Sequence, residues 1–284
     1  MTDIALKAGK APRVRRGALT HGRGLAGLVL VGVVVAAGLL APLLTPYTPQ
    51  QQIPGANLLG ASGGHPFGTD EVNRDVFTRV LHGVRVDLAV CLLAVPFGAL
   101  LGGLAGLLAG RSGIADVFTQ RAFDVVLAFP PVILGIAVTA VLGPGVLPVV
   151  CVVIAAEVPL FGRLVRTATL KVRELPYVDA AETMGASRTW VLRKHVVPNI
   201  LDAVIVQLAL SASVAVFIVS AMNFIGIGVR PPAPSLGGVL ADAMGQLGSN
   251  NLYAVGPLLV IVVLVLGFQL IAQALLASRR GGAR

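Results

Sequence analysis

The sequence predicts an all-α integral membrane protein with about six transmembrane helices and a cytoplasmic loop built from short helices. The first observation is composition. Of 284 residues, 56% are hydrophobic and only 12% are charged, whereas about 25% charge is usual for a soluble domain. Such a surplus of apolar residues cannot all fit inside one water-soluble core, so the bilayer is the expected solvent.

The second observation is a set of six apolar segments, each close to the roughly 20 residues that a bilayer requires. Only Gly143-Pro144-Gly145 separates the third segment from the fourth, so these two are expected to form a helical hairpin. The predicted spans are residues 25–44, 88–110, 123–142, 146–164, 204–229 and 252–278.

Basic residues predict the orientation. The N-terminal tail (1–24), the loop 165–203 and the C-terminal tail (279–284) carry most of the 22 Lys and Arg residues. Because Lys and Arg accumulate in cytoplasmic segments, these three are predicted to be cytoplasmic, with both termini on that side. Segments 45–87 and 230–251 are then extracytoplasmic.

Composition also argues against other classes. The net charge of +9 does not indicate a nucleic-acid partner, because the basic residues cluster between apolar runs. The first apolar run is longer than the core of a signal peptide, so we expect an uncleaved helix and one membrane domain over 25–278. Cys91 and Cys151 both lie in apolar runs and are expected to be small buried hydrophobes.

The second predicted helix carries Gly98, Gly102, Gly106 and Gly110, four residues apart. Small residues at this spacing let two helix backbones approach closely in a membrane. A close helix contact is therefore expected, either within this chain or with another subunit.

Sequence motifs for chemistry are mostly absent. There is no G-x-x-x-x-G-K-[ST], H-E-x-x-H or C-x-x-C, and the G-x-G-x-x-G over residues 22–27 follows no strand. The four histidines lie far apart in the sequence. We therefore expect no enzyme activity, no metal site and no cofactor bound by this chain.

Glu157 is the one acid deep within a predicted span. An ionisable residue is costly there and suggests a function. Two roles remain open. Glu157 lines the translocation path and meets a cationic or amine group, or it is a structural glutamate bonded to a neighbouring helix.

The cytoplasmic loop 165–203 predicts two short helices separated by Gly185. Pro176 suits the first turn of the first helix, and Gly185 can adopt the left-handed conformation that ends it. Ser187 is expected to cap the second helix.

The second short helix has an apolar stripe formed by Val191, Leu192 and Val196, with basic residues beside it. Pro198 is expected to limit its continuation. The loop either lies on the membrane surface as an amphipathic segment or projects as a rigid docking element.

This loop resembles the signature of bacterial ABC importer permeases, E-A-A-x-x-x-G followed downstream by L-P-N. Asp179-Ala180-Ala181 stands at the E-A-A, with Asp replacing Glu, Gly185 at the glycine and Pro198-Asn199 at the end. Other motifs resemble the dipeptide/oligopeptide/nickel group, and its C-type subunit in particular, over residues 65–275. They are His65-Pro66-Phe67-Gly68-Thr69-Asp70-Glu71, Arg74-Asp75-Val76, Asp124 to Pro130 and Gly226 to Ser235.

Three departures from that group stand out. Leu236 replaces a usual Trp, Glu157 stands where a small residue is frequent, and residues 273–278 replace a polar end rich in Gly and Asp. The change at Glu157 bears on substrate choice.

The resemblance implies a permease subunit that forms half of a pore in the bacterial cell membrane. Its implied partners are a second homologous permease, two ATP-binding cassette ATPases that use ATP and Mg²⁺, an extracytoplasmic binding protein and membrane lipid. Peptides are the implied substrates, with nickel, haem or glutathione as alternatives. The implied coupling residues are Asp179, Ala180, Ala181, Glu182, Gly185, Ala186, Ser187, Arg193 and Pro198.

An ion-coupled secondary transporter is the rival interpretation of several spans with a buried acid. Such a transporter more often shows an inverted repeat with broken helices at matched positions. No such repeat is visible in the sequence.

Overall fold

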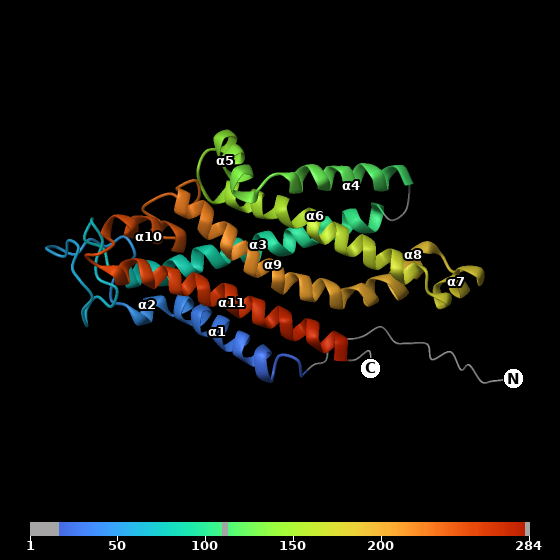
Figure 1. Cartoon of the computed structure of the whole chain (residues 1–284), viewed down its shortest axis with the longest axis horizontal. Coiled ribbons are helices and arrows are strands. Elements are labelled where there is room, and N and C mark those ends of the chain that lie inside the picture. The colour runs from blue at the N-terminus through green and yellow to red at the C-terminus, as the bar shows by residue number, and fades with distance from the viewer. Residues whose placement is uncertain (1–16, 110–112, 282–284) are drawn as a thin grey trace.

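The computed structural model describes residues 17–109 and 113–281, which are almost entirely helical. The helices form a long bundle, with α10 and the segment 45–75 at one end and α7 and α8 at the other (Figure 1). In chain order the helices are α1 (Gly22–Leu39), α2 (Ala41–Leu44), α3 (Val76–Ala109), α4 (Gly113–Ala128), α5 (Pro131–Leu142), α6 (Val146–Arg173), α7 (Pro176–Thr183), α8 (Arg188–Val191), a π-helical turn (Leu192–Val196), α9 (Val197–Ile225), α10 (Leu236–Ala243), a 3₁₀ turn (Met244–Gln246) and α11 (Asn251–Gly281).

Among the described residues, five helical stretches are long and apolar enough to cross a membrane. They are α1, α3, α6, the continuous stretch Thr189–Ile225 and most of α11. The pair α4 and α5 makes a sixth if it is counted as one span, but it is bent by 91°. The chain is therefore a multi-pass membrane protein.

The predicted span over 123–142 is not one continuous helix, since it comprises the end of α4, a bend and α5. Phe129-Pro130-Pro131 interrupts it, because a residue before proline avoids the α-helical region and Pro131 instead begins α5. The predicted hairpin between the third and fourth spans therefore involves α5 and α6. These two helices meet at Gly143-Pro144-Gly145, where both glycines have positive φ.

Helix α3 begins at Val76 rather than at residue 88, so it extends into the segment predicted to be an outer loop. Asp87 lies in this extension and is fully buried. Its carboxylate accepts hydrogen bonds from Asn223 Nδ2 and from the backbone N–H of Leu236, each at 3.1 Å. A polar residue that is satisfied in this way can be buried in a helix, which hydropathy alone does not reveal.

Ion pairs attach the segment 45–75 to the helices at the same end. Asp70 accepts from Arg74 Nε at 2.6 Å and lies 3.4 Å from Arg79 Nη1. Arg79, which is 4% exposed, also reaches Asp242 of α10 at 3.3 Å. Burial raises the pKa of the Asp242 carboxyl, and the charge of Arg79 opposes that rise. The network ties this segment to both α3 and α10.

The spaced glycines of α3 contact α6 of the same chain, which confirms one of the two alternatives. A Cβ at Gly102 would lie 2.3 Å from the carbonyl oxygen of Val158, and one at Gly106 would lie 2.3 Å from that of Gly162. Backbones this close exclude any side chain larger than hydrogen. Gly110 lies outside the described residues.

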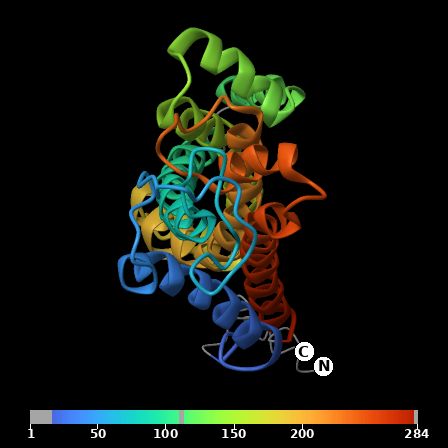
Figure 2. The ribbon, with the colours of Figure 1, turned by 90° about the vertical axis from the view of Figure 1, so that its left-hand side faces the viewer.

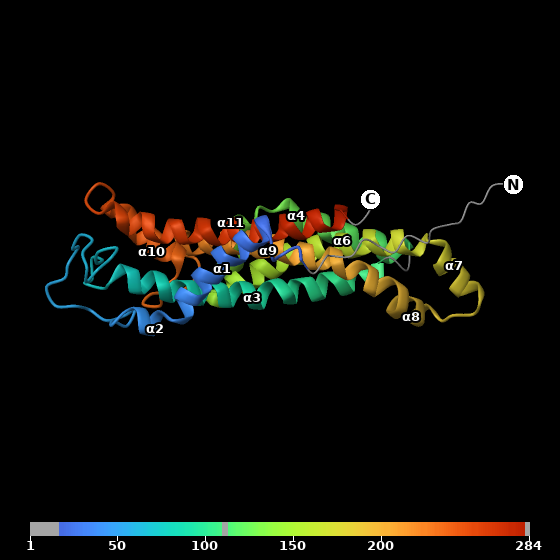
Figure 3. The same cartoon turned by 90° about the horizontal axis from the view of Figure 1, so that it is seen from below.

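The main core lies where α3, α6, α9, α10 and α11 meet. Small β-branched side chains dominate it, and buried members include Val80, Val84, Val149, Val153, Val216 and Val219. Viewed end-on, α5 lies at one edge of the bundle and α1 at the opposite edge (Figure 2). Helix α1 begins, and α11 ends, toward the end that carries α7 and α8 (Figures 1 and 3).

Candidate functional site

Helix α7 carries the first predicted coupling residues. Pro176 lies in its first turn, as predicted, and so does Asp179, whose carboxylate suits the positive end of a helix. Ala181 is 6% exposed and faces the protein. Asp179, Ala180 and Glu182 are exposed. Of the two alanines, Ala181 is thus buried and Ala180 is exposed.

Gly185 ends α7 in a left-handed conformation with φ of 87°, as predicted. Its N–H donates to the carbonyl of Glu182 at 2.9 Å, and the N–H of Ala186 donates to that of Ala181 at 3.0 Å. These two bonds form a Schellman motif, which satisfies carbonyls at the helix end. No heavy atom lies within 4 Å of a Cβ built at Gly185. The backbone conformation, rather than lack of space, therefore favours glycine.

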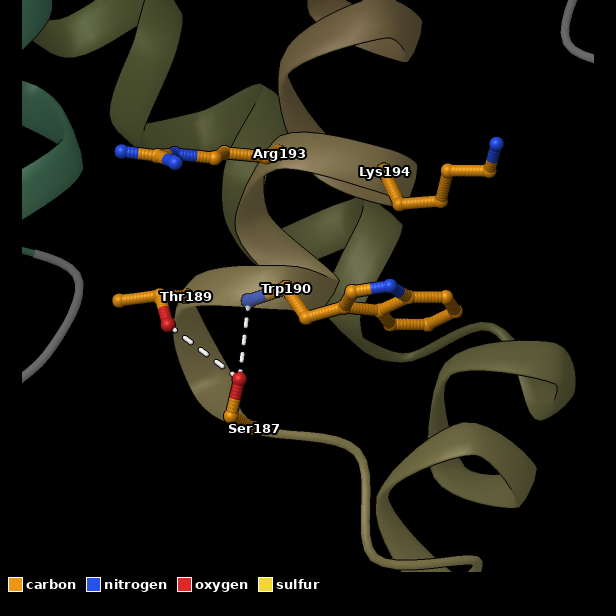
Figure 4. Close-up of a pocket in the computed structure, with 5 residues that line it drawn as sticks. All are labelled: Ser187, Thr189, Trp190, Arg193 and Lys194. Atoms are coloured by element: carbon orange, nitrogen blue, oxygen red, sulfur yellow. Dashed lines mark hydrogen bonds between the residues drawn. The ribbon is translucent and has the colours of Figure 1, made fainter.

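Ser187 caps α8, as predicted. Its Oγ accepts a hydrogen bond from the backbone N–H of Trp190 at 3.3 Å and lies 3.3 Å from the hydroxyl of Thr189 (Figure 4). The cap satisfies an N–H that has no partner within the helix. The connection between α7 and α8 is therefore held by the Schellman motif at its start and by the Ser187 cap at its end.

The prediction that Pro198 limits the second helix is wrong. The π-helical turn follows α8 directly, and α9 begins at Val197 with Pro198 in its first turn. A proline inside a regular helix would remove a hydrogen bond and crowd a carbonyl. The π-helical turn places Pro198 at the start of a new helical segment, where that loss is tolerated. The second short helix is consequently continuous with the fifth span.

A small hydrophobic core holds both short helices on the ends of α6 and α9. Val191 and Val196 are buried and Leu192 packs against them, so the predicted apolar stripe is confirmed. We call this cluster the loop core. Its buried members are Val165, Val172, Val178, Ala181, Val191, Val196 and Ile200. One cluster thus joins α7 and α8 to α6 and α9.

The exposed charges of the loop are divided between its two helices. Asp179 and Glu182 are exposed on α7, whereas Arg193 and Lys194 are exposed on the π-helical turn. A hollow of about 390 Å³ opens beside the basic residues (Figure 4). Its lining consists of Ser187, Thr189, Trp190, Arg193 and Lys194.

Two large apolar side chains at the loop were not among the predicted coupling residues. Met184 is 82% exposed at the end of α7, and Trp190 is 48% exposed on α8. Both side chains are thus open to contact with another molecule. Trp190 is the chain's one tryptophan, and its place in a polar loop was a usable signal.

An aromatic group holds α7 against the start of α9. The ring of His195 lies 5.3 Å from that of Tyr177 and 5.1 Å from that of Trp190, between centroids. Asn199 Nδ2 donates to the Tyr177 hydroxyl and to the His195 carbonyl. Burial raises the pKa of the Tyr177 hydroxyl. The contacts of Tyr177 with His195 and Asn199 join residues distant in sequence, so no local pattern identified them.

Glu157 lies apart from the loop, in the middle of α6, and is fully buried. Ser211 of α9 donates a hydrogen bond to its Oε2, while its Oε1 has no hydrogen-bond partner among the described residues. A Cβ at Gly98 of α3 would lie 2.7 Å from the Glu157 Cβ. In this conformation the side chain is enclosed by α3, α6 and α9 of its own chain. Over the described ranges, no three His, Cys, Asp or Glu residues are placed to hold a metal ion.

Comparison with known proteins identifies relatives over most of the chain. Residues 98–280 match the family described as binding-protein-dependent transport system inner membrane component, and residues 14–61 match the N-terminal transmembrane domain of oligopeptide transport permease C. The dipeptide transport system permease protein of Alkalihalophilus pseudofirmus is 35% identical over 252 residues, which cover 88% of this chain and 83% of that protein. The glutathione transport system permease protein of Pectobacterium atrosepticum is 34% identical over 263 residues, which cover 92% and 87%.

A solved structure has the same fold. The MetNI methionine ABC transporter, in an inward-facing conformation, contains a chain that aligns with a TM-score of 0.57 and 22% identity, covering 72% of this chain and 97% of that one. The curated relatives are transport components rather than enzymes. On the match over residues 98–280, this chain belongs to the family of binding-protein-dependent transport system inner membrane components.

Proposed function

We propose that this chain is one of two permease subunits that together enclose the path of an ATP-driven peptide importer. One observation carries the proposal. Two short helices project at one end of the membrane bundle, with a rigid connection at Gly185 and a shared core with α6 and α9. An element that is exposed on one side and bound to two spans on the other suits the transmission of movement.

In this proposal the ATPases drive transport through the loop. ATP and Mg²⁺ bind to separate ATPase subunits, whose closure displaces α7 and α8. The loop core passes that displacement to α6 and α9, and access to the path changes. The residues proposed for coupling are Asp179, Ala180, Ala181, Glu182, Gly185, Ala186, Ser187, Arg193 and Pro198, of which Ala181 acts from within the loop core. We add the exposed Met184 and Trp190 to the proposed contact surface.

Membership of the family implies partnership with another permease and with ATPase subunits. We further propose that an extracytoplasmic binding protein delivers the substrate to the opposite end of the bundle. That end carries the segment 45–75 and α10, which the ion pairs of Arg79 hold together. Membrane lipid surrounds the exposed apolar faces of the spans.

Peptides are the proposed cargo because the relatives named above transport a dipeptide or glutathione, which is itself a tripeptide. Nickel and haem remain alternative cargoes. Binding competition with dipeptides, oligopeptides, glutathione, haem and Ni²⁺ on the partner binding protein separates these classes.

The distribution of basic residues supports a cytoplasmic location for the loop 165–203 and both termini. Part of each predicted tail, residues 1–16 and 282–284, lies outside the described residues. Cysteines at the exposed positions Gly60 and Ser249 should react with an impermeant thiol reagent in intact cells. A cysteine at Met184 should react only after permeabilisation, and its labelling in intact cells would reverse the orientation.

The decisive experiment is uptake by proteoliposomes that contain this chain with its permease, ATPase and binding-protein partners. We expect peptide uptake that requires both ATP and the binding protein and survives collapse of ion gradients by ionophores. Uptake that persists without ATP and stops with ionophores would favour the ion-coupled alternative.

A further inference from the structure

Helix α4 buries little of its surface against the rest of the described chain. Phe123, at 5% exposure, is the one buried residue along its described length. Val117 and Phe118 are 58% and 73% exposed. Apolar packing within the chain therefore contributes little to the position of α4, and other contacts must determine it.

The Phe123 ring lies directly on a glycine of α6. A Cβ at Gly162 would come within 2.3 Å of the ring atom Cζ. On another side of α6, the carbonyl of Gly162 lies against Gly106 of α3. Gly162 thus admits close neighbours from both α3 and α4, and the three helices pack against one another at this level.

Two ion pairs accompany the Phe123 contact. The Asp116 carboxylate accepts hydrogen bonds from both Nε and Nη2 of Arg166, a bidentate arrangement that also fixes orientation. The Asp124 carboxylate accepts one from Nη2 of Arg163 at 2.5 Å. The two pairs show that α4 and α6 run antiparallel, and the Phe123–Gly162 contact adjoins the Asp124–Arg163 pair.

We propose that these contacts form a clasp by which α6 carries α4 with it when the loop moves. The α4 clasp consists of Asp116, Phe123 and Asp124 on α4 with Gly162, Arg163 and Arg166 on α6. The inference rests on the proposed function, because the movement it transmits begins at the ATPase contact.

The position of the clasp on α6 supports this role. Val165, a member of the loop core, is the direct neighbour of Arg166 and lies on the same helix as Arg163. A displacement of α7 therefore reaches α6 at the level of both arginines. On the far side, α4 leads through the 91° bend into α5, which packs on α6 and α9 nearer the other end of the bundle. The clasp thus joins α6, beside the loop core, to the pair α4 and α5.

The first test removes the acids without removing bulk. In the assembled importer, the double variant Asp116→Asn with Asp124→Asn should lower ATP-dependent peptide uptake by about tenfold or more, the scale of an allosteric coupling. The ATPases should still co-purify, because α7 and α8 are unchanged. Arg121→Gln is the matched control, since Arg121 lies on the same helix, is 80% exposed and reaches Asp124 only at 3.7 Å.

A charge swap separates a specific pair from general damage. Asp124→Arg with Arg163→Asp should recover a large part of the uptake that Asp124→Arg alone loses. Uptake equal to wild type in the double Asn variant, or no recovery in the swap, would overturn the clasp.

The second test does not depend on substrate. Spin labels at Val117 on α4 and Leu160 on α6, both partly exposed, report the distance between the helices in a background with Cys91 and Cys151 replaced. Upon ATP binding to the complex, that distance should stay constant in the parent and change in the double Asn variant. A change in the parent would refute the clasp. Absence of ATP-dependent uptake by the parent would instead refute the proposed function.

Discussion

Helix α6 makes two contacts of opposite character, one with α3 and one with α4. Toward α3 the closest contacts are backbone on backbone, at Gly102 and Gly106. Toward α4 they are two ion pairs and one aromatic ring that lies on a glycine. The first contact depends on the absence of side chains, whereas the second depends on charge. The α3–α6 contact is therefore broken by an added methyl group, and the α4–α6 contact by removal of charge.

The largest expected effect comes from forcing α3 and α6 apart. Gly102→Ala places a Cβ 2.3 Å from the carbonyl oxygen of Val158, so the two helices must separate. We expect the free energy of unfolding to fall by about 1–3 kcal/mol. A lower melting temperature of the purified protein in detergent would show this loss.

Gly103→Ala is the matched control for that experiment. Its Cβ would make an ordinary contact of 3.8 Å with Val165 Cγ2. It adds the same methyl group to the same helix, so it should leave the melting temperature unchanged. Equal melting temperatures of the Gly102→Ala and Gly103→Ala variants would show that close backbone packing does not determine the α3–α6 contact.

The next effect tests the connection at the far end of α6. Gly185→Val forces a β-branched residue to a φ of 87°, which costs about 1–2 kcal/mol. The loop should rearrange to relieve this cost, so uptake and ATPase co-purification should both fall while membrane insertion persists. Gly185→Asn should be milder, since asparagine tolerates positive φ better. Normal uptake by the Val variant would argue against the loop as the coupling element.

A smaller effect is expected at Glu157, which lies where α6 meets α3 and α9 and is not part of the α4 clasp. Glu157→Gln keeps an oxygen that can accept from Ser211 and removes the charge. Because the side chain is fully buried in its own chain, we expect normal assembly and no change in substrate preference, as a structural role requires. Altered uptake of cationic peptides relative to neutral ones would instead place Glu157 on the translocation path.

The smallest effect is a response to salt. Asp124 and Arg163 are partly exposed, so added salt should screen their attraction. Amide hydrogen exchange in α4 should rise modestly between low and high ionic strength, while exchange in α3 near Gly102 stays constant. An equal rise of amide hydrogen exchange in α3 and α4 would show that the two contacts of α6 do not differ in their dependence on charge.

Sequence reasoning succeeded where the cause is local. The turn at Gly185, the Ser187 cap and the proline at the start of α7 each depend on residues a few positions apart, and all three are present. The number of spans followed in the same way from apolar length, provided that α4 and α5 count together.

Where the cause lies in distant residues, sequence reasoning failed. Asp87 is buried because partners in α9 and α10 satisfy it, and only folding brings these together. The Phe123 contact with Gly162 joins two spans whose facing sides the sequence leaves open. The break at Pro130-Pro131 had a local signal, but the apolar run concealed it.

The π-helical turn before α9 has a consequence for the design of such subunits. A π-helical turn holds one more residue than an α-helical one, so it behaves as a single insertion within a continuous helical rod. One residue corresponds to a rotation of about 100° around an α-helix. That rotation would follow from an insertion in a regular α-helix, whereas the wider π-helical turn Leu192–Val196 absorbs the extra residue within one turn. Trp190 therefore keeps its azimuth relative to the span beyond Pro198, and the cytoplasmic face holds an additional residue without a change in its orientation.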